Sequence, residues 1–173
     1  MFIELSIFSV LATLLLFGFI FAGVARFGVL PSYSDYSSMW GKAVPMNNMN
    51  VWSIVTMLSA FLLCPALIEI GAASAWQFLG FLTPLYLIIV SLTPNWKTNI
   101  TQWRVHMIFA ALCALGGLAW IFLVAHTLKL FAIIVAFVFT LAMFSGLARR
   151  CSIFWGEMIM FLSVYVSTLL LIL

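Results

Sequence analysis

The chain has 173 residues, of which 66% are hydrophobic and only 6% are charged. Soluble domains carry about 25% charged residues, so water cannot solvate this surface and lipid has to be the solvent for most of the chain. The net charge of +3 comes from basic residues that stand singly or in one pair, which excludes the basic run of a nucleic-acid-binding protein.

Apolar segments long enough to cross a bilayer follow one another along the chain. About 20 apolar residues span a hydrocarbon core of about 30 Å, and the connections between these segments are mostly short. The length leaves no room for a soluble domain, so we predict an all-α integral membrane bundle of six helices in a single domain. The predicted spans are residues 5–25, 51–70, 76–92, 104–126, 129–147 and 153–173.

The distribution of basic residues predicts how the bundle is oriented. Six spans place both termini on the same side, and the opposite side then holds every basic residue except Lys129. Short cytoplasmic loops are rich in Lys and Arg, so we predict termini outside the cytoplasm, in a bacterial inner membrane. The basic residues on the predicted cytoplasmic side are Arg26, Lys42, Lys97, Arg104, Arg149 and Arg150.

The loop between the first two spans is the longest polar stretch. Tyr36, Met39 and Trp40 have helical spacing and follow Pro31, which predicts a short helix that lies in the membrane interface with its apolar side down. Such a helix would hold three polar residues at the height of the lipid headgroups. They are Ser32, Ser34 and Asp35.

Ionisable residues inside predicted spans are costly and therefore mark candidate sites. His106 opens the fourth span, and Glu157 lies seven residues after Arg150, or about 10 Å further along the helix at 1.5 Å per residue. Together with the polar residues of the first loop, they predict a pocket near the cytoplasmic face. The candidate binding residues are Ser32, Ser34, Asp35, Asn50, Ser53, His106 and Glu157.

Two interpretations of this cluster stay open. A carboxylate, an imidazole and hydroxyl groups at one depth would suit a cation, a lipid headgroup or a proton relay, or amide hydrolysis if a metal were present. Alternatively, Glu157 pairs with His106 or Arg104 and joins helices without any ligand.

The sequence predicts no metal site and no cofactor. The three cysteines have neither a C-x-x-C pair nor a zinc-binding spacing. His106 and His126 lie at opposite ends of one predicted helix, about 30 Å apart, so they cannot hold one haem or one metal. At the other face, we expect Glu4 and Glu69 to form surface ion pairs with His126 and Lys129.

Four short patterns carry a resemblance to known proteins. They are Leu30–Tyr36, Gln77–Phe81, Val105–His106 and Trp155–Glu157. On these patterns the chain resembles a group of small polytopic membrane proteins from gut bacteria and their phages. The resemblance covers most of the chain and implies a multi-span fold, but no activity.

Two further resemblances are more distant. The Ser and Asp of the first loop, an Asn before the second span and His106 are similar to six-span autophagy modulators of the DRAM type. The Asn50-Val-Trp-Ser53 element is similar to the membrane hydrolases of the alkaline ceramidase and progestin receptor superfamily. That superfamily binds zinc through a histidine triad, whereas this chain has two histidines, so the resemblance does not extend to zinc chemistry.

These patterns lead to three functional hypotheses. The first is binding or transport of a lipid headgroup, small molecule or cation, which helix kinks at Pro65 and Pro84 would favour by opening polar backbone to a cavity. The second is an accessory protein that forms homo-oligomers or binds a membrane-protein partner. The third is a lipid-modifying membrane enzyme. Against this hypothesis, the sequence contains no familiar catalytic motif such as H-E-x-x-H or G-x-S-x-G. The expected partner in each case is membrane lipid, not nucleic acid.

Overall fold

The computed structural model describes residues 2–43, 50–125, 134, 138 and 152–173. Six helices and no strands are present in this part of the chain. They are α1 (Phe2–Phe27), α2 (Asp35–Ala43), α3 (Val51–Ile70), α4 (Phe78–Ser91), α5 (Ile100–Leu123) and α7 (Ser152–Ile172).

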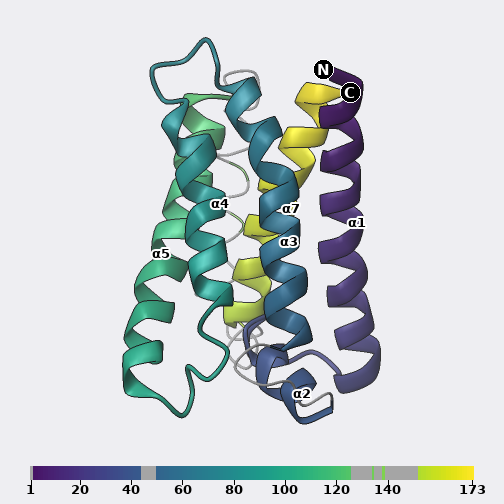
Figure 1. Ribbon diagram of the computed structural model, residues 1–173, viewed down its shortest axis with the longest axis vertical. Helices are drawn as coiled ribbons and strands as arrows, with labels where there is room; N and C mark the ends of the chain where they lie inside the picture. The colour runs from purple at the N-terminus through teal and green to yellow at the C-terminus, as the bar shows by residue number, and fades with distance from the viewer. Residues whose placement is uncertain (1, 44–49, 126–133, 135–137, 139–151) are drawn as a thin grey trace.

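The long helices run side by side (Figure 1). Both termini lie at one end of the bundle, and α2 lies at the other end with the loop of residues 92–99. Helix α3 packs between α1 and α4, α4 packs on α5, and α7 contacts α1, α3 and α5. The end that carries α2 is therefore where the first loop, the 92–99 loop and the start of α7 come together.

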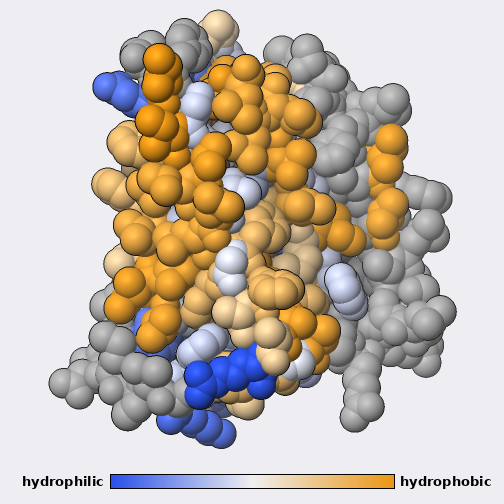
Figure 2. All heavy atoms as spheres, turned by 90° about the vertical axis from the view of Figure 1, so that its right-hand side faces the viewer, coloured by the Kyte–Doolittle hydropathy of each residue, from blue (hydrophilic) through white to orange (hydrophobic). Residues whose placement is uncertain are grey.

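Four helices are long and apolar enough to cross a membrane: Ile3–Phe27, Val51–Ile70, Ile100–Leu123 and Ile153–Ile172. Helix α4 is apolar but shorter, with 14 residues. Figure 2 shows that hydrophobic side chains cover most of the middle of one face, with hydrophilic ones near the two ends. A broad exposed apolar surface of this kind is typical of a protein that contacts lipid.

The prediction of an all-helical chain with long apolar helices is confirmed, while the number of spans stays a prediction. Helix α3 has the predicted limits, but α5 begins at Ile100 instead of 104. The reason is Asn99, whose side-chain oxygen accepts hydrogen bonds from the backbone N–H groups of Thr101 and Gln102 and so caps the helix one turn earlier. The predicted span 129–147 lies outside the described residues, apart from Ile134 and Val138.

Small residues allow close contact between α3 and α4. A Cβ atom on Gly80 would lie only 2.6 Å from the carbonyl oxygen of Leu67, so only glycine permits this approach. In lipid, where apolar burial drives helix association weakly, such backbone contact and interhelical hydrogen bonds hold helices together. The indole N–H of Trp120 in α5 donates to the same Leu67 oxygen at 3.2 Å.

The first loop packs into the bundle by means of Tyr36. Its ring lies against Gly23 of α1, where a Cβ atom would be 2.9 Å from the ring, and its hydroxyl donates to the Gly28 oxygen at 2.7 Å. The predicted short helix is present and begins at Asp35, four residues after Pro31, while its position in the membrane interface stays a prediction. Tyr36, expected to face the lipid interface, is fully buried in the protein core instead.

Candidate functional site

The segment from Pro31 to Ser34 lies between the start of α7 and the neighbouring helices. The Pro31 oxygen accepts from the Phe154 N–H at 2.9 Å, and the Tyr33 N–H donates to Oε2 of Glu157 at 2.5 Å. The Tyr33 hydroxyl bonds to the hydroxyl of Thr56 in α3 at 2.7 Å. These contacts tie the first loop to helices from both halves of the chain.

His106 is buried at the same end of the bundle and bonds to two hydroxyl groups. Its Nδ1 lies 2.8 Å from Oγ1 of Thr93, and its Nε2 lies 2.9 Å from Oγ of Ser34. The ring is stacked on Trp96, with 4.8 Å between the centroids and an interplanar angle of 13°. Side chains from the first loop and the 92–99 loop therefore fix the imidazole on three sides.

The hydrogen bonds around His106 assign its tautomer. The hydroxyl of Thr93 has a single proton, and it donates that proton to the Val90 oxygen at 2.6 Å. Thr93 Oγ1 can therefore only accept from His106, which places the imidazole proton on Nδ1 in the neutral ring. Nε2 is then an acceptor, and the Ser34 hydroxyl donates to it.

Glu157 and His106 do not bond to each other in the described part of the chain. Glu157 accepts from Tyr33, His106 bonds to Ser34 and Thr93, and the Tyr33–Ser34 segment lies between them. The Ser34 side chain also approaches the Glu157 carboxyl group. Of the two interpretations left open by the sequence, the one with a direct Glu157–His106 pair is therefore not seen among the described residues, where Ser34 lies between the two side chains.

Asp35 is occupied by contacts that stabilise the loop. One carboxylate oxygen lies 2.5 Å from the Lys97 ammonium, and the other accepts from the Ser32 N–H at 3.2 Å. The second contact is half of a capping box, in which a Ser is followed three residues later by an acidic residue. The pattern Ser32-x-x-Asp35 is visible in the sequence and points to this role.

Asn50 and Ser53, also predicted as binding residues, form the cap of α3. The Asn50 side-chain oxygen accepts from the Ser53 N–H at 3.0 Å, and its amide group donates to Ser37 in α2. Both residues are buried. They connect α2 to α3 at the same end of the bundle as Ser34 but do not line the cavity described next.

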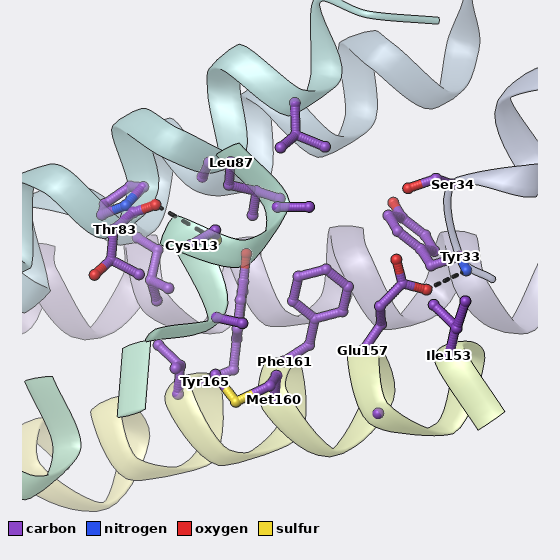
Figure 3. A pocket seen from close by; sticks show the side chains of 18 of the residues that line it. Tyr33, Ser34, Thr83, Leu87, Cys113, Ile153, Glu157, Met160, Phe161 and Tyr165 are labelled. Carbon is purple, nitrogen blue, oxygen red and sulfur yellow. Dashed lines mark hydrogen bonds between the residues drawn. The ribbon is translucent and has the colours of Figure 1, made fainter. Parts of the chain in front are cut away.

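A cavity of about 200 Å³ lies among α3, α4, α5, α7 and the first loop. Figure 3 shows Tyr33, Ser34 and Glu157 together at one side of this cavity, with Thr83 and Cys113 at the opposite side. Most of the remaining wall is apolar. It includes Leu63, Leu67, Leu87, Val90, Ala110, Ala114, Met160, Phe161 and Val164.

The polar atoms of the cavity wall are few and mostly occupied. The Tyr165 hydroxyl bonds to Ser59 at 2.6 Å, and burial raises the pKa of the Tyr33 phenol, so this group stays neutral at physiological pH. Thr83 Oγ1 is buried and has no hydrogen-bond partner among the described residues. The groups that remain able to contact a ligand are the Ser34 hydroxyl and the Glu157 carboxyl at one side and the Thr83 hydroxyl at the other.

The described residues contain no group of three or more His, Cys, Asp or Glu side chains placed to hold a metal ion. On the opposite face, the expected ion pairs of Glu4 and Glu69 involve His126 and Lys129, which lie outside the described residues. The sequence matches no protein-family model, and comparisons with curated proteins and with solved structures find no match either.

Of the seven predicted binding residues, Ser34 and Glu157 line the cavity, and His106 contacts it through Ser34. Sequence reasoning missed Tyr33, Thr93, Trp96 and Lys97. Thr93 and Trp96 belong to a polar loop, and no local pattern shows that this loop packs against the first one.

Proposed function

We propose that this protein binds an amphipathic molecule within the membrane, with the apolar part in the cavity and the polar part at Ser34 and Glu157. The observation that carries this proposal is that Ser34 and Glu157 lie together at one side of a cavity whose wall is mostly apolar, with the Thr83 hydroxyl at the opposite side. Ligand sites are typically apolar pockets with a few converging polar groups.

The cavity volume limits the size of the apolar part. An apolar cavity of about 150 Å³ takes up a molecule the size of benzene, so about 200 Å³ accommodates a short hydrocarbon segment or one ring. A complete two-chain lipid does not fit. Ile153 lines the cavity beside Glu157 and is 53% exposed, so the polar side of the cavity lies close to the surface of the described part of the chain.

The polar side of the cavity favours a headgroup that donates hydrogen bonds. The Tyr33 N–H occupies one acceptor position of the Glu157 carboxyl group, which keeps further acceptor capacity. A headgroup with an amine or hydroxyl therefore suits Glu157 better than an ionised carboxylate or phosphate, which has no proton to donate to it.

Binding of single-chain probes tests this proposal. Fluorescent dodecyl amine, dodecanol and dodecanoate derivatives are titrated into the protein in nanodiscs, with Glu157→Gln as the comparison variant. We expect the amine to bind at least 10-fold more tightly than the carboxylate, and Glu157→Gln to remove this preference. Equal binding of all three probes to both proteins, or no binding, would refute the proposal.

For the membrane arrangement, we propose six spans with both termini outside the cytoplasm of a bacterial cell. One support is the presence of four long apolar helices. The other is that four basic residues lie at or near the end of the bundle that carries α2: Arg26, Lys42, Lys97 and Arg104. Basic residues concentrate on the cytoplasmic side. Homo-oligomers and membrane-protein partners stay predictions from the sequence.

A further inference from the structure

The Ser34 hydroxyl has an unusual acceptor for a buried serine. Buried serines on helices commonly donate to a backbone carbonyl four residues earlier, as Ser9 does with Leu5 and Ser163 does with Ile159 in this chain. Ser34 instead lies 2.9 Å from the Nε2 atom of His106. It comes directly before α2 in the first loop, and its side chain lines the cavity.

The tautomer of His106 makes Nε2 the acceptor of the Ser34 proton. The Nδ1–H group donates to Thr93 Oγ1, whose own proton goes to the Val90 oxygen. A hydroxyl that donates to a neutral imidazole, which a third group orients through its other nitrogen, is the arrangement of an activated nucleophile. Thr93 here takes the orienting position that an acidic residue takes in the Ser-His-Asp arrangement.

Two contacts would stabilise the charged ring that forms when His106 takes up a proton. The imidazole lies parallel to the face of Trp96 at 4.8 Å between centroids, and a cation over an indole face is stabilised by the electrons of the ring. Thr93 Oγ1 remains an acceptor for the Nδ1 proton in either charge state.

We propose that Ser34 is a nucleophile and His106 its general base, and that together they cleave an ester whose acyl chain occupies the cavity. The substrate class rests on the proposed function, because the apolar wall places the chain and Ser34 lies at the polar side where the ester group would be. Thr93 and Trp96 are positioning residues that act through His106.

The reaction proceeds in two balanced steps. Ser34 Oγ attacks the ester carbonyl carbon and gives its proton to His106 Nε2; the bond from that carbon to the alcohol oxygen then breaks, and His106 returns the proton to the departing alcohol. A water molecule next attacks the acyl-Ser34 ester, again losing a proton to Nε2. The acyl–Oγ bond breaks, and Ser34 regains its proton as the carboxylic acid leaves.

Covalent labelling tests this proposal directly. A fluorophosphonate with an octyl chain is incubated with the purified protein in nanodiscs, and the site of phosphonylation is located by peptide mass spectrometry. We expect one adduct on Ser34, formed as the phosphorus–fluorine bond breaks and fluoride leaves. Ser34→Ala should remove the adduct. Ser38→Ala should leave it unchanged, because Ser38 is a nearby serine whose hydroxyl donates to the backbone oxygen of Asp35.

Variants around the imidazole separate catalysis from a structural role. We expect His106→Gln to slow labelling at least 100-fold, as general base catalysis contributes about 10²–10⁴-fold. Thr93→Val should slow labelling about 10-fold, because it removes the acceptor that holds the Nδ1 proton, and Thr93→Ser should restore the rate. If His106 only joins the first loop to the 92–99 loop, these variants change thermal stability but not the labelling rate per folded molecule.

The dodecyl amine titration distinguishes failure of this proposal from failure of the proposed function. Wild-type protein that binds the amine but takes no label at Ser34, or that is labelled equally after His106→Gln, overturns the nucleophile assignment and leaves the binding function standing. Ser34 labelled in a protein that binds no single-chain probe would refute the binding function while supporting the nucleophile.

Discussion

The backbone N–H of Tyr33 donates to the Glu157 carboxyl group at 2.5 Å, and this bond joins residues 124 positions apart in the sequence. It fixes the first loop against the last helix at the polar side of the cavity (Figure 3). Glu157 therefore both holds the loop in place and faces the space where a ligand would bind.

Replacing Glu157 should separate these two roles. Glu157→Ala leaves the Tyr33 N–H without an acceptor, and an unsatisfied buried donor costs about 1–3 kcal/mol. Glu157→Gln keeps an acceptor oxygen, so we expect its free energy of unfolding to stay within about 1 kcal/mol of the wild type. Thermal and denaturant unfolding in detergent measure both values. Equal stability of the alanine variant and the wild type would show that this bond contributes little to the fold.

The Lys97–Asp35 ion pair should contribute more than a typical surface pair. The Lys97 side chain is 49% exposed, but that of Asp35 is only 6% exposed, so Lys97→Met leaves a largely buried carboxylate without its counter-ion. We expect a loss of about 1–3 kcal/mol. Adding Asp35→Asn removes the charge and keeps an acceptor for the Ser32 N–H, so the double variant should recover part of the loss.

The double-mutant cycle gives the coupling energy between Lys97 and Asp35. An effect of Lys97→Met below about 0.5 kcal/mol would identify the pair as an ordinary solvent-screened surface contact. In that case the loop would depend on its other contacts, which include its capping bonds, Tyr36 and the bond from Tyr33 to Glu157.

Close packing between α3 and α4 predicts a contrast between two glycines. Gly80→Ala places a methyl group 2.6 Å from the Leu67 oxygen, which forces the helices apart, and we expect a loss of about 1–3 kcal/mol. Gly18→Ala in α1 meets no atom within 4 Å and removes a helix-destabilising glycine, so it should be neutral or stabilising by up to about 1 kcal/mol. The melting temperatures of the two variants are measured in the same detergent. Similar values for Gly80→Ala and Gly18→Ala would contradict the packing described for α3 and α4.

The proposed orientation predicts the location of both termini. Alkaline phosphatase fused after Leu173 should be active, because it folds outside the cytoplasm, and green fluorescent protein at that position should be dark. A fluorescent protein inserted between Lys42 and Ala43 should be bright. The opposite pattern would place the α2 end of the bundle outside the cytoplasm.

Local features of the sequence predicted the all-helical fold and its long apolar helices. The limits of α3 follow from an apolar run that begins directly after Asn50, a residue that caps it, so the prediction and the structure agree. The start of α5 was missed by four residues because Asn99 lies in a polar loop, where composition alone does not distinguish a loop residue from a helix cap.

The site was predictable only in part, because its contacts join distant segments. The depth of His106 and Glu157 in apolar helices marked them as candidates, and Ser34 was placed near them by its position in the first loop. That Thr93 and Trp96 fix the imidazole depends on how the 92–99 loop packs, which no spacing in the sequence reveals. The capping roles of Asp35 and Asn50 follow from local patterns, which explain these residues without a ligand.

The central claim is that a ligand's apolar part occupies the cavity, and filling that cavity tests it most directly. Ala114 lines the cavity on α5, and Ala111 lies on the exposed face of the same helix. Isothermal titration with the dodecyl amine should show Ala114→Phe binding at least 10-fold more weakly than wild type, a loss of about 1.4 kcal/mol, with Ala111→Phe unchanged. Wild-type affinity in both variants would contradict the account.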